Sequence, residues 1–195
     1  MTLDLEGVLV PEIWIAVAER TGIETLRRTT RDEPDYDVLM RGRLAILAEH
    51  GLTMSTIEDV IATLSPEPGA LEFLSDLRSL TQVVILSDTF AQFARPLMAQ
   101  LDWPTILCHQ LVVRDDRVVD YELRQHDQKR RAVEAFHSLN YRVLAAGDSY
   151  NDTSMLGAAD VGVLFRSPAN VIAEFPQFVA VTEYDELLNI FQQHL

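Results

Sequence analysis

The chain has 195 residues, which suits one domain with an insertion or two small domains. Its content of 48% hydrophobic and 24% charged residues is ordinary for a globular protein. The formal net charge of -14 argues against a nucleic-acid partner and against an anionic membrane surface, because both need a basic footprint. Any anion site therefore has to be built locally, from particular lysines, arginines and backbone N–H groups.

The cysteine usage and the N-terminal composition predict a cytoplasmic protein. Cys108 is the single cysteine, so no intrachain disulfide can form, and its apolar neighbours predict a buried, inert thiol. The first residues lack the basic start of a signal peptide. No apolar run approaches the roughly 20 residues that span a bilayer, so we expect no membrane partner.

The first third of the sequence predicts one short strand followed by helices. The strand covers residues 3–5, and the helices cover residues 11–21, 35–50 and 55–64, with Pro34 in a charged loop after the first. These helices have no strand between them. This pattern is typical of a small helical cap inserted into an α/β core.

Local signals define the limits of this predicted cap. Pro11 suits the first turn of a helix and Gly51 suits a helix end. Ser55 and Glu58 form a capping-box pattern. The Ser-Pro-Glu-Pro-Gly segment at residues 65–69 predicts a hinge. We therefore expect a cap at residues 11–68 and a core at residues 1–10 and 69–195.

From residue 69 onward, predicted helices and strands alternate, which indicates a parallel sheet with crossover helices. The expected strands cover residues 83–86, 143–146, 161–165 and 179–182, and a hairpin covers residues 111–119. The expected helices cover residues 69–80, 90–101, 128–139, 155–159 and 185–194, and Pro96 should kink or restart the second. The predicted fold is α/β: a doubly wound, Rossmann-like parallel sheet with a small helical cap inserted after the first strand.

Two acids follow the first strand. The carboxylate of Asp4 can attack phosphorus and form an aspartyl-phosphate. Glu6 lies two residues on, where it can give a proton to a leaving alcohol and later take one from an incoming alcohol. An isolated Asp-x-Glu is more often a helix-capping or turn-stabilising pair, so this motif is weak alone.

Two further positions suit an anion. The Ser87 hydroxyl can donate to a phosphoryl oxygen beside the backbone N–H groups of Asp88 and Thr89 at a helix start. Lys129, at the start of a predicted helix, can neutralise charge on a transferring group. Taken singly, Ser87 is more often a helix N-cap and Lys129 a solvated lysine.

The segment from Gly147 to Asp152 is more specific. Gly147 permits a tight turn, Asp148 can reach a metal ion, and Asp152 can orient Asp148 or a metal-bound water. The ligand spacing of a calcium-binding EF-hand is absent. Strand ends of a parallel sheet meet at one edge, where clustered carboxylates would repel one another without a cation, and Mg²⁺ suits such oxygens.

Together these residues resemble the haloacid dehalogenase superfamily of phosphotransferases over nearly the whole chain. The matching elements are Asp4-Leu5-Glu6-Gly7-Val8, Ser87, Lys129 and residues 147–152. The helical insertion resembles the cap of the phosphoserine phosphatase branch. The amino-acid sequence of residues 4–14 and 147–152 is similar to that of the bifunctional phosphoserine phosphatase/homoserine phosphotransferase subfamily.

This resemblance implies Mg²⁺-dependent hydrolysis of O-phospho-L-serine through a phosphorylated Asp4, with homoserine as an alternative acceptor. Asp4, the backbone carbonyl of Glu6, and Asp148 would hold the metal, and Asp152 would support the metal site. Asp4 would be the nucleophile and Glu6 the acid/base.

The resemblance also assigns the substrate contacts. Ser87, Asp88 and Lys129 would hold the phosphoryl group, and Asn151 would contact the phosphate or the leaving side. Glu12 would face the substrate ammonium, and the guanidinium of Arg43 would grip its carboxylate. The alternative for Glu12 and Arg43 is a solvated helix charge. The sequence leaves a homodimer open.

Two departures bear on these assignments. Most of the superfamily has Asp where this chain has Glu6, a substitution shared with the bifunctional subfamily. Only three residues precede Asp4, so either the first strand is minimal or the native start lies upstream. The competing hypotheses are a phosphatase for another small phosphomonoester and a non-catalytic, receiver-like phosphate-binding domain.

Overall fold

In a computed structural model, the described residues (1–30, 32–33 and 35–195) include seven strands in one sheet, ordered β4-β3-β2-β1-β5-β6-β7. Pro34, expected in a charged loop, lies outside the described residues. The strands are β1 (Thr2–Leu3), β2 (Val84–Phe90), β3 (Thr105–Arg114), β4 (Arg117–Glu122), β5 (Leu144–Gly147), β6 (Val161–Phe165) and β7 (Val179–Val181). All neighbouring strands are parallel except β3 and β4, which form an antiparallel hairpin.

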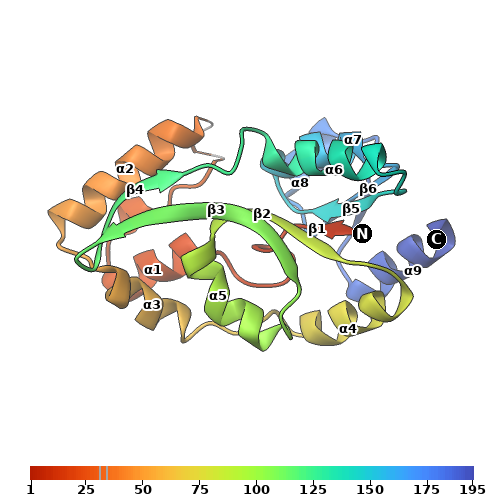
Figure 1. The fold of residues 1–195 in the computed structure, drawn as a ribbon. Coiled ribbons are helices and arrows are strands. Elements are labelled where there is room, and N and C mark those ends of the chain that lie inside the picture. Colours follow the sequence, from red (N-terminus) through yellow and green to blue (C-terminus); the bar gives the residue numbers. More distant parts are fainter. Residues whose placement is uncertain (31, 34) are drawn as a thin grey trace.

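Helices cover both faces of this sheet, as the alternating pattern predicts (Figure 1). One face carries α6 (Gln128–Ser138), α7 (Thr153–Ala158) and α8 (Ala169–Glu174). The other face carries α4 (Ala70–Leu80), α5 (Ala91–Gln100) and α9 (Tyr184–His194). The expected doubly wound α/β fold is confirmed, whereas α8 was not predicted.

Alternation along the strands builds a separate apolar core on each face of the sheet. Ile85 and Val163 pack in the core that includes α4, α5 and α9. Their neighbours Leu86 and Leu164 pack in the other core with α6 and α7. The central strands therefore read as continuous apolar runs, because both of their faces are buried.

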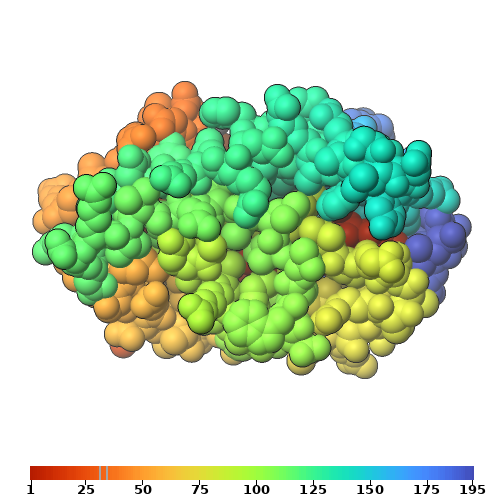
Figure 2. Space-filling model, in the orientation of Figure 1, coloured from red at the N-terminus to blue at the C-terminus, as the bar shows by residue number. Residues whose placement is uncertain are grey.

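The central strand β1 is short and covers only Thr2 and Leu3. Thr2 pairs with Val84 of β2 on one side and with Ala145 of β5 on the other. The backbone N–H of Asp4 continues the ladder by donating to the carbonyl of Ala146 at 3.0 Å. Figure 2 shows the N-terminal residues at the base of a hollow between α4 and α6, at the amino edge of the sheet.

The inserted helices lie at the opposite end of the molecule, beside the β3–β4 hairpin (Figure 1). They are α1 (Ile13–Thr21), the 3₁₀ helix η1 (Glu24–Arg27), α2 (Tyr36–Glu49) and α3 (Met54–Ile61). Val17, Met40 and Ile57 from these helices share one apolar cluster with Phe93 of the core. The limits of the cap at residues 11–68 therefore stay a prediction.

One local prediction is wrong, and half of another. The capping box of Ser55 and Glu58 does not form, because Ser55 donates its hydroxyl to Asp116 in the hairpin turn at 2.7 Å. Thr53 caps α3 instead, accepting from the N–H of Thr56 at 3.1 Å. The helix α5 continues through Pro96 without restarting, since buried side chains on both sides of Pro96 hold it on one core, and the kink stays a prediction.

The predicted hairpin is longer than residues 111–119, because β3 begins at Thr105 and pairs in parallel with β2 before it turns. Asp115 and Asp116 form the charged turn with φ of 48° and 61°. Such left-handed conformations match the twist of a two-residue hairpin. Within the part of the chain that the structure describes, no helix is both long and apolar enough to cross a membrane.

Candidate active site

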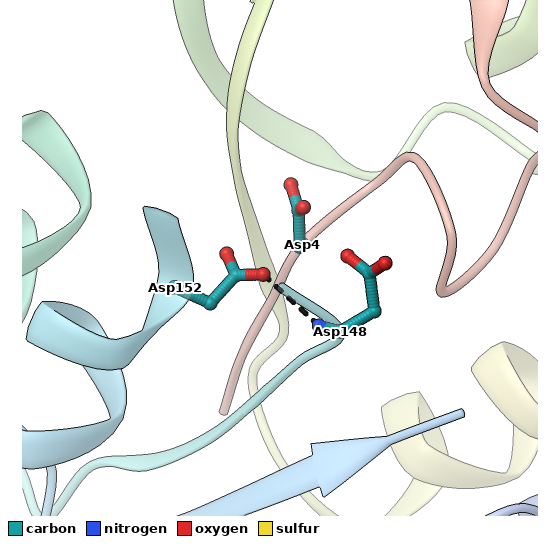
Figure 3. A group of neighbouring side chains, drawn as sticks. All are labelled: Asp4, Asp148 and Asp152. Carbon is teal, nitrogen blue, oxygen red and sulfur yellow. Dashed lines mark hydrogen bonds between the residues drawn. The ribbon is translucent and has the colours of Figure 1, made fainter. Parts of the chain in front are cut away.

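The carboxyl ends of two central strands, β1 and β5, and the short helix after β5 bring three acids together. Asp4 follows β1, Asp148 follows β5, and Asp152 lies in the 3₁₀ helix η2 (Tyr150–Asp152). One carboxylate oxygen from each lies within 4.8 Å of the others, and all three residues are buried. Figure 3 shows that the three carboxylates approach the same point from different segments.

Two glycines make room for these carboxylates. A Cβ at Gly7, whose φ is 77°, would lie 2.6 Å from Cγ of Asp148. A Cβ at Gly147 would lie 2.3 Å from Cγ of Asp152. Neither distance is sterically allowed, so the motif glycines permit the close approach of backbone and acid that the cluster requires.

Lys129 is the cation inside this acidic cluster. Its ammonium lies 2.7 Å from Oδ1 of Asp152 and 2.9 Å from Oδ1 of Asp4, and the side chain is 2% exposed. The other oxygen of Asp152 accepts from the backbone N–H groups of Asp148 at 3.0 Å and Ser149 at 3.1 Å. The alternative of a solvated lysine is therefore wrong.

The cluster nevertheless carries more negative than positive charge. Burial raises the pKa of Asp4 well above its usual value, and repulsion from Asp152 and Asp148 adds to it, while Lys129 opposes the shift. The pKa of Lys129 is raised well above its usual value, because attraction to Asp152, Asp4 and Asp88 outweighs burial. Three oxygen donors with uncompensated charge fit a small, hard divalent cation.

Glu6 connects this cluster to the first cap helix. Its Oε2 accepts a hydrogen bond from the N–H of Ile13 at the start of α1, at 2.9 Å. Burial raises the pKa of Glu6, while hydrogen bonds from Ile13 and Thr89 and the charge of Arg43 oppose the shift. The helix-capping interpretation is thus correct for Glu6, and the same carboxylate also lines the pocket beside Asp4.

Arg43 of α2 forms the far wall of the pocket. One terminal nitrogen donates to the carbonyl of Arg28 at 2.7 Å, and the guanidinium lies 4.6 Å from the centre of the Trp14 ring. The alternative of a solvated charge is wrong, because Arg43 is 8% exposed, and burial lowers its pKa to about 10. Its Nε is buried and has no hydrogen-bond partner in the described structure.

One pocket collects nine of the ten predicted site residues: Asp4, Glu6, Glu12, Arg43, Ser87, Asp88, Lys129, Asp148 and Asn151. The tenth, Asp152, is fully buried behind Lys129. We call Asp4, Ser87, Lys129, Asp148 and Asp152 the core side, and Glu12, Trp14 and Arg43 the cap side. Between them, the pocket encloses about 80 Å³.

One expectation about Ser87 needs correction. Ser87, Asp88 and Thr89 lie near the carboxyl end of strand β2, which extends to Phe90, and not at the start of a helix. The N–H of Thr89 donates to the Ser87 hydroxyl at 3.3 Å. These three residues lie where the pairing of β2 with β3 is irregular, between the paired residues Leu86 and Phe90, and the helix α5 begins only after them.

Several unpredicted side chains line the same pocket, including those of Trp14, Tyr36 and Thr89, of which only the backbone N–H of Thr89 was expected there. The hydroxyl of Tyr36 donates to the backbone carbonyl of Asp88 at 2.9 Å, which joins α2 to β2. Thr89 was recognisable, since it is two residues from Ser87 and strand side chains repeat with period two. Trp14 and Tyr36 carried no such signal, because their role depends on where the cap packs.

Comparison with known proteins defines the class. The haloacid dehalogenase-like hydrolase family matches residues 3–157, and this chain belongs to that family. In structure, the chain resembles a phospho-aspartyl intermediate analogue of phosphoserine phosphatase, with a TM-score of 0.81 and 19% identity over 97% of this chain and 96% of that one. At that identity the likeness concerns the fold.

Two bacterial relatives are much more similar in sequence. The phosphoserine phosphatase of Pseudomonas syringae pv. tomato is 65% identical over 190 residues, covering 97% of this chain and 80% of that protein. The phosphoserine phosphatase ThrH of Pseudomonas aeruginosa is 64% identical over 190 residues, covering 97% of this chain and 93% of that protein. The fold, the family and these relatives agree on a phosphatase of the haloacid dehalogenase class.

Proposed function

We propose that this chain is a Mg²⁺-dependent phosphoserine phosphatase that converts O-phospho-L-serine to L-serine and phosphate. The observation that carries the proposal is the buried cluster of Asp4, Asp148 and Asp152 around Lys129, facing Arg43 across one pocket. Two relatives at 64–65% identity bear the name phosphoserine phosphatase, which supports the same substrate.

In this proposal Asp4 is the nucleophile. Lys129 and the N–H of Leu5, at 2.8 Å, both bind Oδ1 of Asp4, so we assign the attack to Oδ2. The new bond joins Oδ2 to phosphorus as the ester bond to the serine oxygen breaks. Glu6, whose pKa burial raises, gives its proton to that oxygen. Water then attacks phosphorus, loses a proton to Glu6, and releases phosphate with the Asp4 carboxylate.

We assign the metal to Mg²⁺ held by Asp4, Asp148 and the backbone carbonyl of Glu6, with Asp152 as support. When bound, the ion supplies charge neutralisation for the phosphoryl oxygens and for the clustered carboxylates. The chain itself supplies Ser87 and Lys129 for the same oxygens, and Asn151 at the edge of the pocket. These donors would hold a phosphoryl group of any small ester.

The cap side of the pocket would supply the preference for an amino acid. Arg43 carries a buried Nε–H without a partner, and a buried unsatisfied donor is unfavourable until a ligand accepts from it. A carboxylate is the acceptor that matches a guanidinium best. Glu12, at the entrance to α1 in the same pocket, would face the substrate ammonium.

Pocket size favours this substrate over a nucleotide. The free volume of about 80 Å³ is well below the roughly 300–1,000 Å³ typical of sites for drug-sized ligands. A phosphatase for another small phosphomonoester is the main competing proposal. The family match argues against a receiver-like domain, so we do not propose that function.

Transfer to homoserine is a second proposal, supported by the likeness to the bifunctional subfamily and by the side chains of α1 and α2 that line the pocket. A pocket that excludes water prolongs the life of a phosphorylated intermediate and gives another alcohol time to react. A homodimer and a cytoplasmic location stay predictions.

A panel of small phosphoesters, assayed with and without Mg²⁺ and with added homoserine, tests these proposals. We expect Mg²⁺-dependent release of phosphate, fastest from phosphoserine. Faster turnover of a sugar phosphate or nucleotide would overturn the substrate assignment. Formation of phosphohomoserine from labelled phosphoserine would support transfer, whereas release of phosphate at an unchanged rate with no labelled phosphohomoserine would exclude it.

A further inference from the structure

His109 is a buried side chain beside the pocket that the proposed mechanism does not use. It lies in β3 opposite Phe90 of β2 and is 3% exposed. The backbone N–H of Arg124 donates to its Nδ1 at 3.1 Å. Since Nδ1 accepts, a neutral imidazole carries its proton on Nε2. That Nε2 lies 3.3 Å from the amide nitrogen of Gln128 and 3.5 Å from Oδ1 of Asp88, so the imidazole N–H faces this carboxylate beside Gln128.

Asp88 receives donors on both of its carboxylate oxygens. The amide of Gln128 donates to Oδ1 at 3.3 Å, and the amide of Asn151 donates to Oδ2 at 3.0 Å. Burial would raise the pKa of Asp88, but Lys129, His109 and Asn151 together outweigh it and hold the pKa well below its usual value. Asp88 is therefore a charged carboxylate within reach of the ammonium of Lys129.

The distances around Lys129 show that Asp88 is held back. An ammonium and a carboxylate in direct contact lie about 2.7–2.9 Å apart, as Lys129 does with Asp152 and Asp4. Asp88 stays at 3.7 Å, although it lines the same pocket. The oxygen of Asp88 nearest to Lys129 is Oδ2, which accepts from Asn151. Gln128 and His109 lie at the other oxygen, Oδ1, and hold the carboxylate from that side. These neutral donors compete with Lys129 for Asp88, which explains the longer distance.

The ammonium of Lys129 has three N–H donors. Two are taken by Asp152 and Asp4. The third is contested between Asp88 and whatever anion enters the pocket. We propose that His109 is a positioning residue that keeps Asp88 off Lys129, and thereby reserves one N–H of Lys129 for the phosphoryl group. This inference rests on the proposed function only in assigning the phosphoryl group to the core side.

The consequence is a defined coupling between His109 and Asp88. Without the imidazole N–H, Asp88 moves onto Lys129 and competes with the phosphoryl group. Phosphate binding weakens, and KM rises more than kcat falls. If Asp88 carries no charge, it is not attracted to Lys129. The loss of His109 then frees no competitor for Lys129, and phosphate binding does not weaken further.

A double-mutant cycle with inorganic phosphate as the probe tests this coupling. The variants are His109→Phe, which keeps the ring but removes both nitrogens, His109→Gln, which keeps an N–H donor, and Asp88→Asn, which removes the charge. Calorimetry in Mg²⁺ measures the Kd of phosphate for each. We expect about a 10-fold weaker Kd for His109→Phe, near wild-type binding for His109→Gln, and no added loss for His109→Phe in the Asp88→Asn background.

Two results would overturn the proposal: wild-type phosphate binding by His109→Phe, or an equal loss in both backgrounds, which a merely structural role would give. Thermal melts report whether each variant folds. Where His109→Phe does not fold, His109→Asn, whose amide cannot reach the place of Nε2, takes its position in the cycle. The cycle measures binding of phosphate alone. Failure to hydrolyse phosphoserine would therefore reject the proposed function, while the measured Kd values would still test the role of His109.

Discussion

The two sides of the pocket differ in how their charged groups are satisfied. On the core side, Lys129 already contacts Asp4 and Asp152, and Asp152 also accepts from two backbone N–H groups. On the cap side, Arg43 is also buried but keeps an Nε–H without a partner in the described structure. The core side is organised before a ligand arrives, whereas the cap side is completed by the ligand.

This difference assigns the chemical step to the core side and the choice of substrate to the cap side. A preorganised set of donors stabilises charge without rearranging, and it acts on any phosphoryl group. A buried guanidinium that lacks an acceptor favours only a ligand that brings one. Changes on the core side should therefore affect every substrate, and changes on the cap side only substrates with a carboxylate.

The largest effect is expected for Asp4→Asn on the core side. The amide keeps the shape of the side chain but cannot attack phosphorus, so turnover of every phosphoester should fall by at least about 10³-fold. Steady-state kinetics measure the loss, and circular dichroism with a thermal melt checks that the variant is folded. Turnover within a few fold of wild type would remove Asp4 as the nucleophile.

Removal of the metal should come next in size. A chelator should abolish activity on all esters, and Mg²⁺ should restore it and raise Tm by relieving repulsion among Asp4, Asp148 and Asp152. Asp148→Asn should raise the Mg²⁺ concentration for half-activation by more than about 10-fold. An unchanged rate in the chelator would contradict the metal assignment.

On the cap side, Arg43→Ala should raise KM for phosphoserine by roughly 10–100-fold. Hydrolysis of a phosphomonoester that lacks a carboxylate should change little. Arg43→Lys keeps the charge without the planar fork and should recover only part of the loss.

Arg20→Ala, an exposed arginine on the cap helix α1, is the matched control and should behave as wild type. An equal loss for Arg43→Ala on both kinds of ester would show that Arg43 supports the fold or the chemistry, and would remove the distinction between the two sides.

The smallest effect concerns the attachment of the cap to the hairpin. Ser55→Ala removes the hydroxyl hydrogen bond to Asp116, keeps the one from the backbone N–H, and should lower Tm by roughly 1–3 °C at pH 7. Glu58→Ala, exposed on the same helix, is the control and should leave Tm unchanged, since the predicted capping box does not form.

The Ser55→Ala difference should also depend on pH. Hydrogen bonds from Ser55 lower the pKa of Asp116 in the folded protein. A lowered folded pKa means that the stabilisation is complete above the unfolded value of about 3.9 and is lost as pH falls through the folded value. Melts of Ser55→Ala and wild type should therefore converge in acid, and a difference that persists unchanged there would contradict the assignment.

The sequence could predict those features that depend on local pattern. The strand at residues 161–165 has the predicted limits, because an apolar run between turn residues defines it. The core side was predictable as well, since Asp4 and Asp148 directly follow strands whose ends converge in a parallel sheet. The sequence could not predict which residues from distant segments come into contact.

Three cases illustrate this limit. The first part of β3 was interpreted only as an apolar run around Cys108, because the consecutive apolar residues 106–108 show no alternation that would reveal a strand. Ser55 was predicted to cap its own helix, but its partner, Asp116, lies 61 residues away. The stacking of Arg43 on Trp14 and the reach of His109 to Asp88 depend on packing that no spacing encodes.

Covalent transfer of the phosphoryl group to Asp4 is the central step of the proposed mechanism. The most direct measurement is a rapid acid quench of the enzyme with phosphoserine and Mg²⁺, followed by mass spectrometry to locate any phosphoryl group on the chain. With Asp4 as the nucleophile, we expect one phosphoryl group on Asp4 in the wild type and none in Asp4→Asn. A phosphoryl group on another residue, or steady turnover with no covalent species at any quench time, would contradict this mechanism.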